Sequence, residues 1–243
     1  AVKNMLSDER LTMINSNYKF LKNKLGPLNI SHLDGVLADL GVSSYQFSDN
    51  DRGFSLKYDA VIDMRMDQKM DKNGVFILNK YSSEDLNRVF QEHADFKNPK
   101  SITSAIINYR EKNIIKTTFD FKNIFIDFFN KQFKNKFFAR LFQAIRMEVN
   151  DEVNSLKALL TQAKDLLQPG GRLVVISYHS IEDRIVKNFM KYGGLYNEEQ
   201  KDFYGNIKKV FRIITKKPIC PSNLECKMNN KARSAKLRVC EKI

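Results

Sequence analysis

The sequence of 243 residues has no tryptophan, few prolines and only three cysteines. The cysteines form no Cys-x-x-Cys pair, and the three histidines lie far from them in sequence; they are Cys220, Cys226 and Cys240. This spacing argues against a zinc site and against a disulfide framework. We therefore expect structural thiols, no metal, and a reduced, cytoplasmic location.

Long apolar segments are also lacking. No run of about 18 apolar residues occurs, so a transmembrane helix and a membrane partner are not expected. The start shows no secretory signal pattern. The chain begins at Ala1 within a helical pattern rather than at a methionine, and this indicates that residues are missing upstream.

Acidic residues are too few to balance the basic ones. The chain has 41 Lys and Arg against 28 Asp and Glu, a formal net charge of +13. Such a surface suits a polyanion, because each neutralised phosphate releases counterions. A bias in base composition is the alternative explanation. The basic stretch NNKARSAKLR at 229–238 favours a nucleic-acid partner.

The order of expected elements indicates an α/β fold. Strands are predicted at 11–14, 34–39 and 173–177, the second of them buried, with a helix starting near Tyr18. The third strand follows a stop signal at 169–171. An amphipathic helix at 181–192 comes next, and strands at 209–215 and 235–242 could pair antiparallel. This alternation predicts a sheet with helices on both faces.

Residues 67–140 interrupt that alternation with helical periodicity alone. We expect an all-helical insertion here, which divides the chain into 1–66, 67–140 and 141–243. Ser82 or Ser83 followed by Asp85 supplies an expected helix cap. Its many phenylalanines are expected to form a core, with a base-stacking platform as the alternative; they are Phe119, Phe121, Phe125, Phe128, Phe129 and Phe133.

Polar side chains follow two of the predicted strands. Asp39 comes after Gly-Val-Leu-Ala, and His179 and Ser180 come after Leu-Val-Val-Ile-Ser-Tyr. In open α/β sheets, ligands bind beyond the carboxyl ends of the strands. The pair therefore indicates one crevice. The structural alternatives are an Asx turn or helix cap for Asp39 and a satisfied, partly buried ring for His179.

Six blocks of sequence follow one another along the chain: DGVLADLGVSS-x-QF, RGFS, DMRMDQ, FQAIRMEVNDE, PGGRLVVISYHSIEDRIVK and NNKARSAKLRV. Together, and in this order, they resemble the RsmH/MraW family of small-subunit ribosomal RNA methyltransferases. The resemblance implies a class I, Rossmann-like methyltransferase fold with an inserted helical domain. It also implies transfer of a methyl group from S-adenosyl-L-methionine to the 4-amino group of a cytidine in 16S ribosomal RNA, within the 30S particle. The oligomeric state stays open, a homodimer included.

The family's pattern places cofactor contacts on Tyr18, Asp39 and Gln46. For catalysis we expect Asp39 to hydrogen-bond the cytosine amino group and His179 to accept or relay the proton. Cations expected to contact phosphate are Arg140, Arg146, Lys231, Arg233, Lys236 and Arg238. Arg146 could equally be a buried ion-pair partner of an acid such as Glu148 or Asp151.

Departures from the family's pattern limit what carries over. Tyr45 replaces a common proline, and Lys-Phe-Phe-Ala-Arg at 136–140 replaces a His-Pro-Ala-x-Arg segment. The family's glycine-rich cofactor loop has no counterpart, so the first strand-helix-strand is expected to be absent from this chain. The alternatives are a truncated, catalytically impaired RNA-binding form and a DNA amino-methyltransferase, whose usual Asp/Asn-Pro-Pro-aromatic tetrapeptide is lacking.

Overall fold

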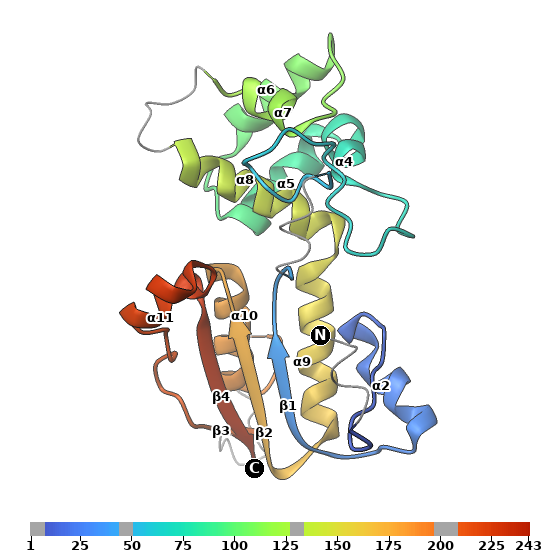
Figure 1. The fold of residues 1–243 in the computed structure, drawn as a ribbon, viewed down its shortest axis with the longest axis vertical. Helices are drawn as coiled ribbons and strands as arrows, with labels where there is room; N and C mark the ends of the chain where they lie inside the picture. Colours follow the sequence, from blue (N-terminus) through green and yellow to red (C-terminus); the bar gives the residue numbers. More distant parts are fainter. Residues whose placement is uncertain (1–7, 44–50, 127–133, 197–208) are drawn as a thin grey trace. The chain divides into compact units, whose positions relative to one another are not determined.

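The computed structural model describes residues 8–43, 51–126, 134–196 and 209–243. The chain divides into two compact units (Figure 1). We call Ala1–Asp39 together with Asn154–Ile243 the sheet unit, and Leu40–Val153 the helical unit. No helix in the described ranges is long and apolar enough to cross a bilayer.

Within the described ranges, four strands form the sheet in the order β1-β2-β4-β3. They are β1 (Leu33–Asp39), β2 (Leu167–Ser177), β3 (Phe211–Ile213) and β4 (Lys236–Lys242). β1 and β2 are parallel, whereas β4 pairs antiparallel with both β2 and β3. The mixed α/β class and the antiparallel pairing of the last two strands are therefore confirmed.

Two expectations about strands near the start of the chain are wrong. Residues 11–14 form no strand, and the side chains of Leu11, Met13 and Ile14 are exposed. In the described part of the chain they have no neighbouring strand with which to pair. β1 was expected to be buried, yet Leu37 is 71% exposed, because among the described residues β1 pairs with β2 alone.

A short helical segment starts at Tyr18, as predicted. It consists of η1 (Tyr18–Phe20), α2 (Leu21–Leu25) and η2 (Gly26–Leu28). The side chain of Asn17 caps η1 by accepting a hydrogen bond from the amide of Lys19 at 2.9 Å. Gln162 then fixes the segment to the sheet unit by accepting from the amide of Lys22 and donating to the carbonyl of Lys19, both at 2.8 Å.

Helix α10 (Ser180–Tyr192) covers one face of the sheet. Its apolar stripe includes Val186 and Phe189, both buried as the period predicts. On the strands, Leu173 pairs with Cys240 and both are fully buried. Burial raises the pKa of the Cys240 thiol to about 12, so this cysteine is an inert packing group. Gly193, at φ 71°, ends the helix in the left-handed conformation that glycine adopts without strain.

The helical unit contains the expected all-helical segment. Its helices are α4 (Gly74–Lys80), α5 (Ser83–Ala94), α6 (Lys100–Arg110), α7 (Thr118–Asn123) and α8 (Lys134–Val149). Ser82 caps α5 by accepting from the amide of Asp85 at 3.0 Å, as predicted. The expected boundaries, 67 and 140, lie inside this unit and remain a prediction. α9 (Glu152–Leu166) leads from it into β2.

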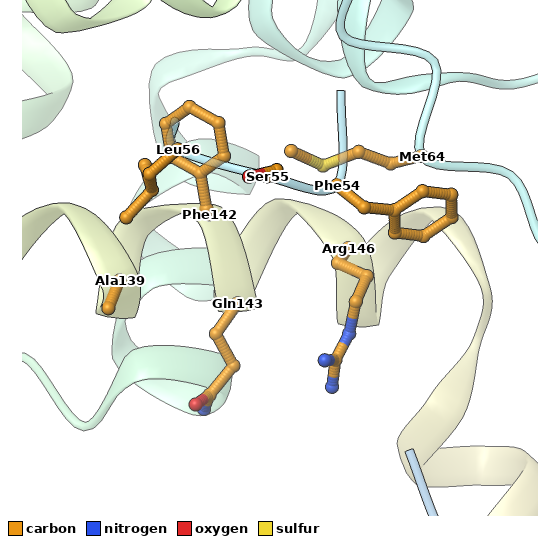
Figure 2. A pocket seen from close by; sticks show the side chains of 8 residues that line it. All are labelled: Phe54, Ser55, Leu56, Met64, Ala139, Phe142, Gln143 and Arg146. Atoms are coloured by element: carbon orange, nitrogen blue, oxygen red, sulfur yellow. The ribbon is translucent and has the colours of Figure 1, made fainter. Parts of the chain in front are cut away.

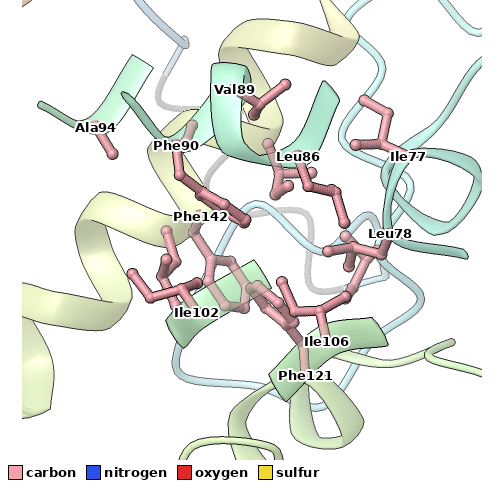
Figure 3. Close-up of a cluster of buried hydrophobic side chains, with 14 of the residues drawn as sticks. Ile77, Leu78, Leu86, Val89, Phe90, Ala94, Ile102, Ile106, Phe121 and Phe142 are labelled. Carbon is pink, nitrogen blue, oxygen red and sulfur yellow. The ribbon is translucent and has the colours of Figure 1, made fainter. Parts of the chain in front are cut away.

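A continuous apolar core holds the helical unit together (Figure 3). Leu78, Leu86, Phe90 and Ile106 are completely buried, and Phe121 is 1% exposed. Phe125 is buried against Phe121 with the two rings edge to face. Among the other phenylalanines predicted to pack, Phe119 is instead 45% exposed, while Phe128, Phe129 and Phe133 lie outside the described residues.

Candidate active site

The carboxyl ends of β1 and β2 bring two polar side chains together. Asp39 is the last residue of β1 and pairs in register with Ile176 of β2. Tyr178 follows two positions later, so the strand period puts it on the same face as Ile176. The Tyr178 hydroxyl donates a hydrogen bond to Asp39 Oδ1 at 2.8 Å. The carboxyl ends of β1 and β2 therefore hold an exposed carboxylate in a fixed orientation.

Tyr178 was not predicted as a site residue. Burial, together with the hydrogen bond to the Asp39 carboxylate, raises the pKa of Tyr178 to about 12. The phenol therefore remains a donor throughout the physiological pH range. A signal was present in the sequence: Tyr178 stands at even spacing from Val174 and Ile176 within Leu-Val-Val-Ile-Ser-Tyr.

His179 has a structural role in this arrangement. It is the N-cap of α10, and its Nδ1 accepts a hydrogen bond from the amide of Glu182 at 3.4 Å. Its Nε2 lies 3.2 Å from Glu182 Oε1. The Glu182 carboxylate also accepts from the amide of Tyr178 at 2.9 Å. Nδ1 thus has a partner in the first turn of α10, whereas Nε2 is buried close to Glu182 and makes no hydrogen bond among the described residues. The alternative of a satisfied histidine therefore fits only one of the two ring nitrogens.

No described contact brings the predicted cofactor residues together. Tyr18 belongs to η1, which Gln162 of α9 fixes to the sheet unit. Because α9 ends at Leu166 and β2 begins at the next residue, Gln162 is near the amino end of β2. Asp39 is at the carboxyl end of β1, and therefore at the opposite end of the parallel strands. Gln46 lies outside the described residues.

Two of the predicted phosphate-binding cations are held by one acid. Arg238 Nε lies 2.6 Å from Asp183 Oδ1, and Lys236 Nζ lies 3.4 Å from Asp183 Oδ2. Burial tends to raise the pKa of Asp183, but the hydrogen bond and charge of Arg238 outweigh it and hold that pKa below its ordinary value. Arg238 and Lys236 therefore stabilise the packing of α10 on β4.

The two predicted cations that precede β4, Lys231 and Arg233, are not held by an acid in the way that Lys236 and Arg238 are. Lys231 and Arg233 lie in η3 (Asn230–Ser234) with exposed side chains. Among the described residues, neither contacts a carboxylate. They are therefore available to an external anion.

Arg140 and Arg146 of α8 both have partners within the helical unit. Arg146 forms two hydrogen bonds with the carboxylate of Glu152, at 2.8 and 2.9 Å. The alternative of an ion pair thus fits Arg146, although its partner is neither of the two acids expected. The Arg140 guanidinium donates to the carbonyl of Ala94 at 2.9 Å and lies 3.9 Å from the centroid of the Phe96 ring.

The helical unit also contains a pocket that the sequence did not predict (Figure 2). Its volume is about 260 Å³, and apolar side chains line most of it, with Gln143 and Arg146 among the lining residues. The other lining residues are Phe54, Ser55, Leu56, Met64, Ala139 and Phe142. Four of these six come from the RGFS, DMRMDQ and FQAIRMEVNDE blocks, namely Phe54, Ser55, Met64 and Phe142. Two phenyl rings in an apolar lining suit the face of a flat ring.

Comparison with known protein families shows one family that matches the whole sequence. Residues 1–243 match the MraW methylase family. This chain belongs to the MraW methylase family. The resemblance inferred from the six blocks of sequence is therefore confirmed, and so is the fold class it implied.

Curated MraW relatives match over nearly the whole chain. "Ribosomal RNA small subunit methyltransferase H" of Flavobacterium johnsoniae is 47% identical over 243 residues, which covers 100% of this chain and 80% of that protein. The protein of the same name from Bacteroides thetaiotaomicron is 42% identical over 242 residues, covering 100% and 80%. That from Karelsulcia muelleri is 44% identical over 239 residues, covering 98% and 79%.

Proposed function

We propose that this chain methylates the exocyclic 4-amino group of a cytidine in small-subunit (16S) ribosomal RNA, with S-adenosyl-L-methionine as the methyl donor. Membership of the MraW family and the names of the relatives support this activity. The positive net charge of +13 suits an RNA substrate. We further propose that the enzyme binds this RNA within the 30S particle.

One observation supports the place of the reaction: Asp39 and Tyr178 meet at the carboxyl ends of two parallel strands. Ligands of open α/β sheets bind at this edge. A carboxylate is a suitable partner for the cationic groups of S-adenosyl-L-methionine, so the residues present fit this donor. When bound, it supplies a methyl group on a positively charged sulfur.

Asp39 has the chemistry needed to activate the acceptor nitrogen. The lone pair of a cytosine amino group is delocalised into the ring, which makes the nitrogen a poor nucleophile. An oxygen that accepts a hydrogen bond from the amino group stabilises the positive charge that develops on the nitrogen. Tyr178 occupies Oδ1 of Asp39, which orients the carboxylate and leaves Oδ2 to the substrate. We assign this acceptor role to Asp39 rather than to His179, whose ring faces Glu182.

We also propose that the pocket of Figure 2 receives an unstacked base of the RNA, because its apolar lining, which includes Phe54 and Phe142, suits a base face. Ser55→Trp would fill this pocket. It is expected to raise KM for RNA at least about tenfold, the cost of about one lost base contact. The affinity for S-adenosyl-L-methionine should not change. Equal KM values for the variant and the unaltered protein would contradict this role.

The activity is tested by product analysis. The full-length protein is incubated with unmethylated 30S particles and isotopically labelled S-adenosyl-L-methionine, and the RNA is digested to nucleosides for mass spectrometry. Labelled N4-methylcytidine is the expected product. A label on carbon 5 of cytidine, or none at all, would contradict the proposal. Preferential transfer to a DNA of the same sequence would instead support the DNA amino-methyltransferase alternative.

A further inference from the structure

The connection between β3 and β4, residues 214–235, is much longer than the geometry requires. Antiparallel neighbours are commonly joined by about two to five residues. This connection contains α11 (Asn223–Met228) and η3. Its length therefore calls for an explanation beyond chain reversal.

The β3–β4 connection follows a fixed path along the sheet. Ile219 and Leu237 exchange two backbone hydrogen bonds of 2.9 Å, and the amide of Ile214 donates to the carbonyl of Val239 at 3.0 Å. Ser222 caps α11 by accepting from the amide of Glu225 at 3.1 Å. The side chains of the connection are thus presented from an anchored backbone.

This connection reaches the carboxyl ends of β1 and β2, where Asp39 and Tyr178 meet. Lys236, the first residue of β4, pairs with Ser177, the last residue of β2. The η3 turn directly precedes Lys236. Figure 1 shows α11 at the same end of the sheet as the carboxyl end of β2. A substrate held by the connection would therefore lie next to the candidate active site.

The charge of the connection is strongly unbalanced. Glu225 is its only carboxylate. Five exposed cations oppose it, and among the described residues none of them contacts an acid: Lys216, Lys217, Lys227, Lys231 and Arg233. By contrast, Lys236 and Arg238, which follow in β4, are both held by Asp183. The unpaired cations thus end where the strand begins.

We propose that the β3–β4 connection is a docking surface for the phosphate backbone of RNA, which holds the substrate beside Asp39. This inference rests on the proposed function and extends it, because it separates the cations that bind substrate from those that hold the fold. The lysines act as point charges, and Arg233 can grip a phosphate with two donors. Backbone contacts of this kind position the RNA without reading its sequence.

The experiment compares two variants with the same change in charge. K227E/K231E reverses two cations of the connection. K22E/K24E is the matched control, since both of its lysines are exposed and lie in the last turn of the short helix α2, near the amino ends of the strands. Both are made in the full-length protein, and circular dichroism verifies folding. RNA dissociation constants are measured over a range of salt concentrations, alongside KM and the single-turnover rate.

K227E/K231E is expected to raise Kd and KM for RNA at least about tenfold, because two phosphate contacts are lost. The slope of log K against log salt should fall by about 0.7–0.9 for each lost contact. The rate at saturating RNA should stay within about twofold, and the control should match the unaltered protein. Equal RNA affinity in the two variants would overturn the proposal, as would a fall in the saturated rate without a change in KM.

A second arm tests an anionic membrane as the partner. Vesicles of phosphatidylcholine with phosphatidylserine are added to the unaltered protein and to K227E/K231E. Binding to vesicles that the substitutions abolish, with RNA affinity unchanged, would overturn the assignment to RNA. Failure of the proposed function is recognised separately, because the unaltered protein would then bind RNA without producing N4-methylcytidine.

Discussion

The two units of the molecule differ in how completely their arginines are paired with acceptors. Every arginine of the helical unit donates a hydrogen bond to an acceptor within that unit; they are Arg52, Arg65, Arg88, Arg110, Arg140 and Arg146. In the sheet unit four arginines also donate to carboxylates, namely Arg10, Arg172, Arg212 and Arg238, but Arg233 contacts no acceptor among the described residues. A basic residue in the sequence therefore indicates RNA binding only after the acids and carbonyls near it in the fold are known.

A similar distinction separates buried from exposed phenylalanines, and here we expect the largest change in stability. Phe121→Ala removes a ring that is 1% exposed in the core of the helical unit. We expect the free energy of unfolding to fall by about 3–5 kcal/mol. Phe119→Ala, two positions away and 45% exposed, should cost less than about 1 kcal/mol. Urea denaturation of both variants provides the measurement, and equal losses would show that the core does not include Phe121.

Arg238 and Arg233 provide the direct test of the comparison. Arg238→Ala leaves the Asp183 carboxylate, whose side chain is 13% exposed, without its main partner. We expect a loss of about 3 kcal/mol, as for other broken buried ion pairs. Arg233→Ala should change stability by no more than about 0.5 kcal/mol and weaken RNA binding instead. If the two variants lost the same stability, the division into structural and available cations would be wrong.

The acid network of the helical unit predicts a pH dependence. Burial would raise the pKa of Glu148, but hydrogen bonds from His93 at 2.9 Å and Arg88 at 2.7 Å outweigh it and lower that pKa from 4.5 to about 2. Because the folded pKa is the lower one, the stabilisation is complete above pH 4.5 and is lost as the pH falls toward 2. Between pH 6 and pH 3 we expect a loss of about 2 kcal/mol.

Two variants isolate this contribution in denaturation curves at several pH values. Glu148→Gln should flatten the dependence between pH 6 and pH 3. Glu92→Gln changes a carboxylate that also contacts Arg88, at 3.4 Å, but is 57% exposed, so it should leave the dependence intact. A slope that survives in Glu148→Gln would assign the effect to other carboxylates.

Local patterns in the sequence were enough to predict much of the fold. The cap at Ser82, the amphipathic period of α10 and the alternation of the last two strands depend on residues close in sequence. The strand expected at 11–14 and the burial expected for β1 failed for another reason. Whether a β-branched or apolar run pairs, and on how many sides, is decided by distant strands, and no local pattern contains that information.

The candidate site, like the fold, could be predicted only where local sequence determines it. Asp39 was found because it ends a strand, whereas its partner Tyr178 comes from the far end of the sequence and required the register of β1 on β2. Arg146 was paired with the wrong acids because its true partner, Glu152, lies six residues away across the turn between two helices. Such pairings depend on how helices end and meet.

The central claim is that methyl transfer takes place at the carboxyl ends of β1 and β2. The most direct measurement is the single-turnover rate of N4-methylcytidine formation by Asp39→Asn, compared with Asp34→Asn. Asp34 is an exposed carboxylate of the same strand at its opposite end. We predict at least a 100-fold fall for Asp39→Asn, about the cost of one lost electrostatic contact in a transition state, and a normal rate for Asp34→Asn. A normal rate for Asp39→Asn would contradict the account.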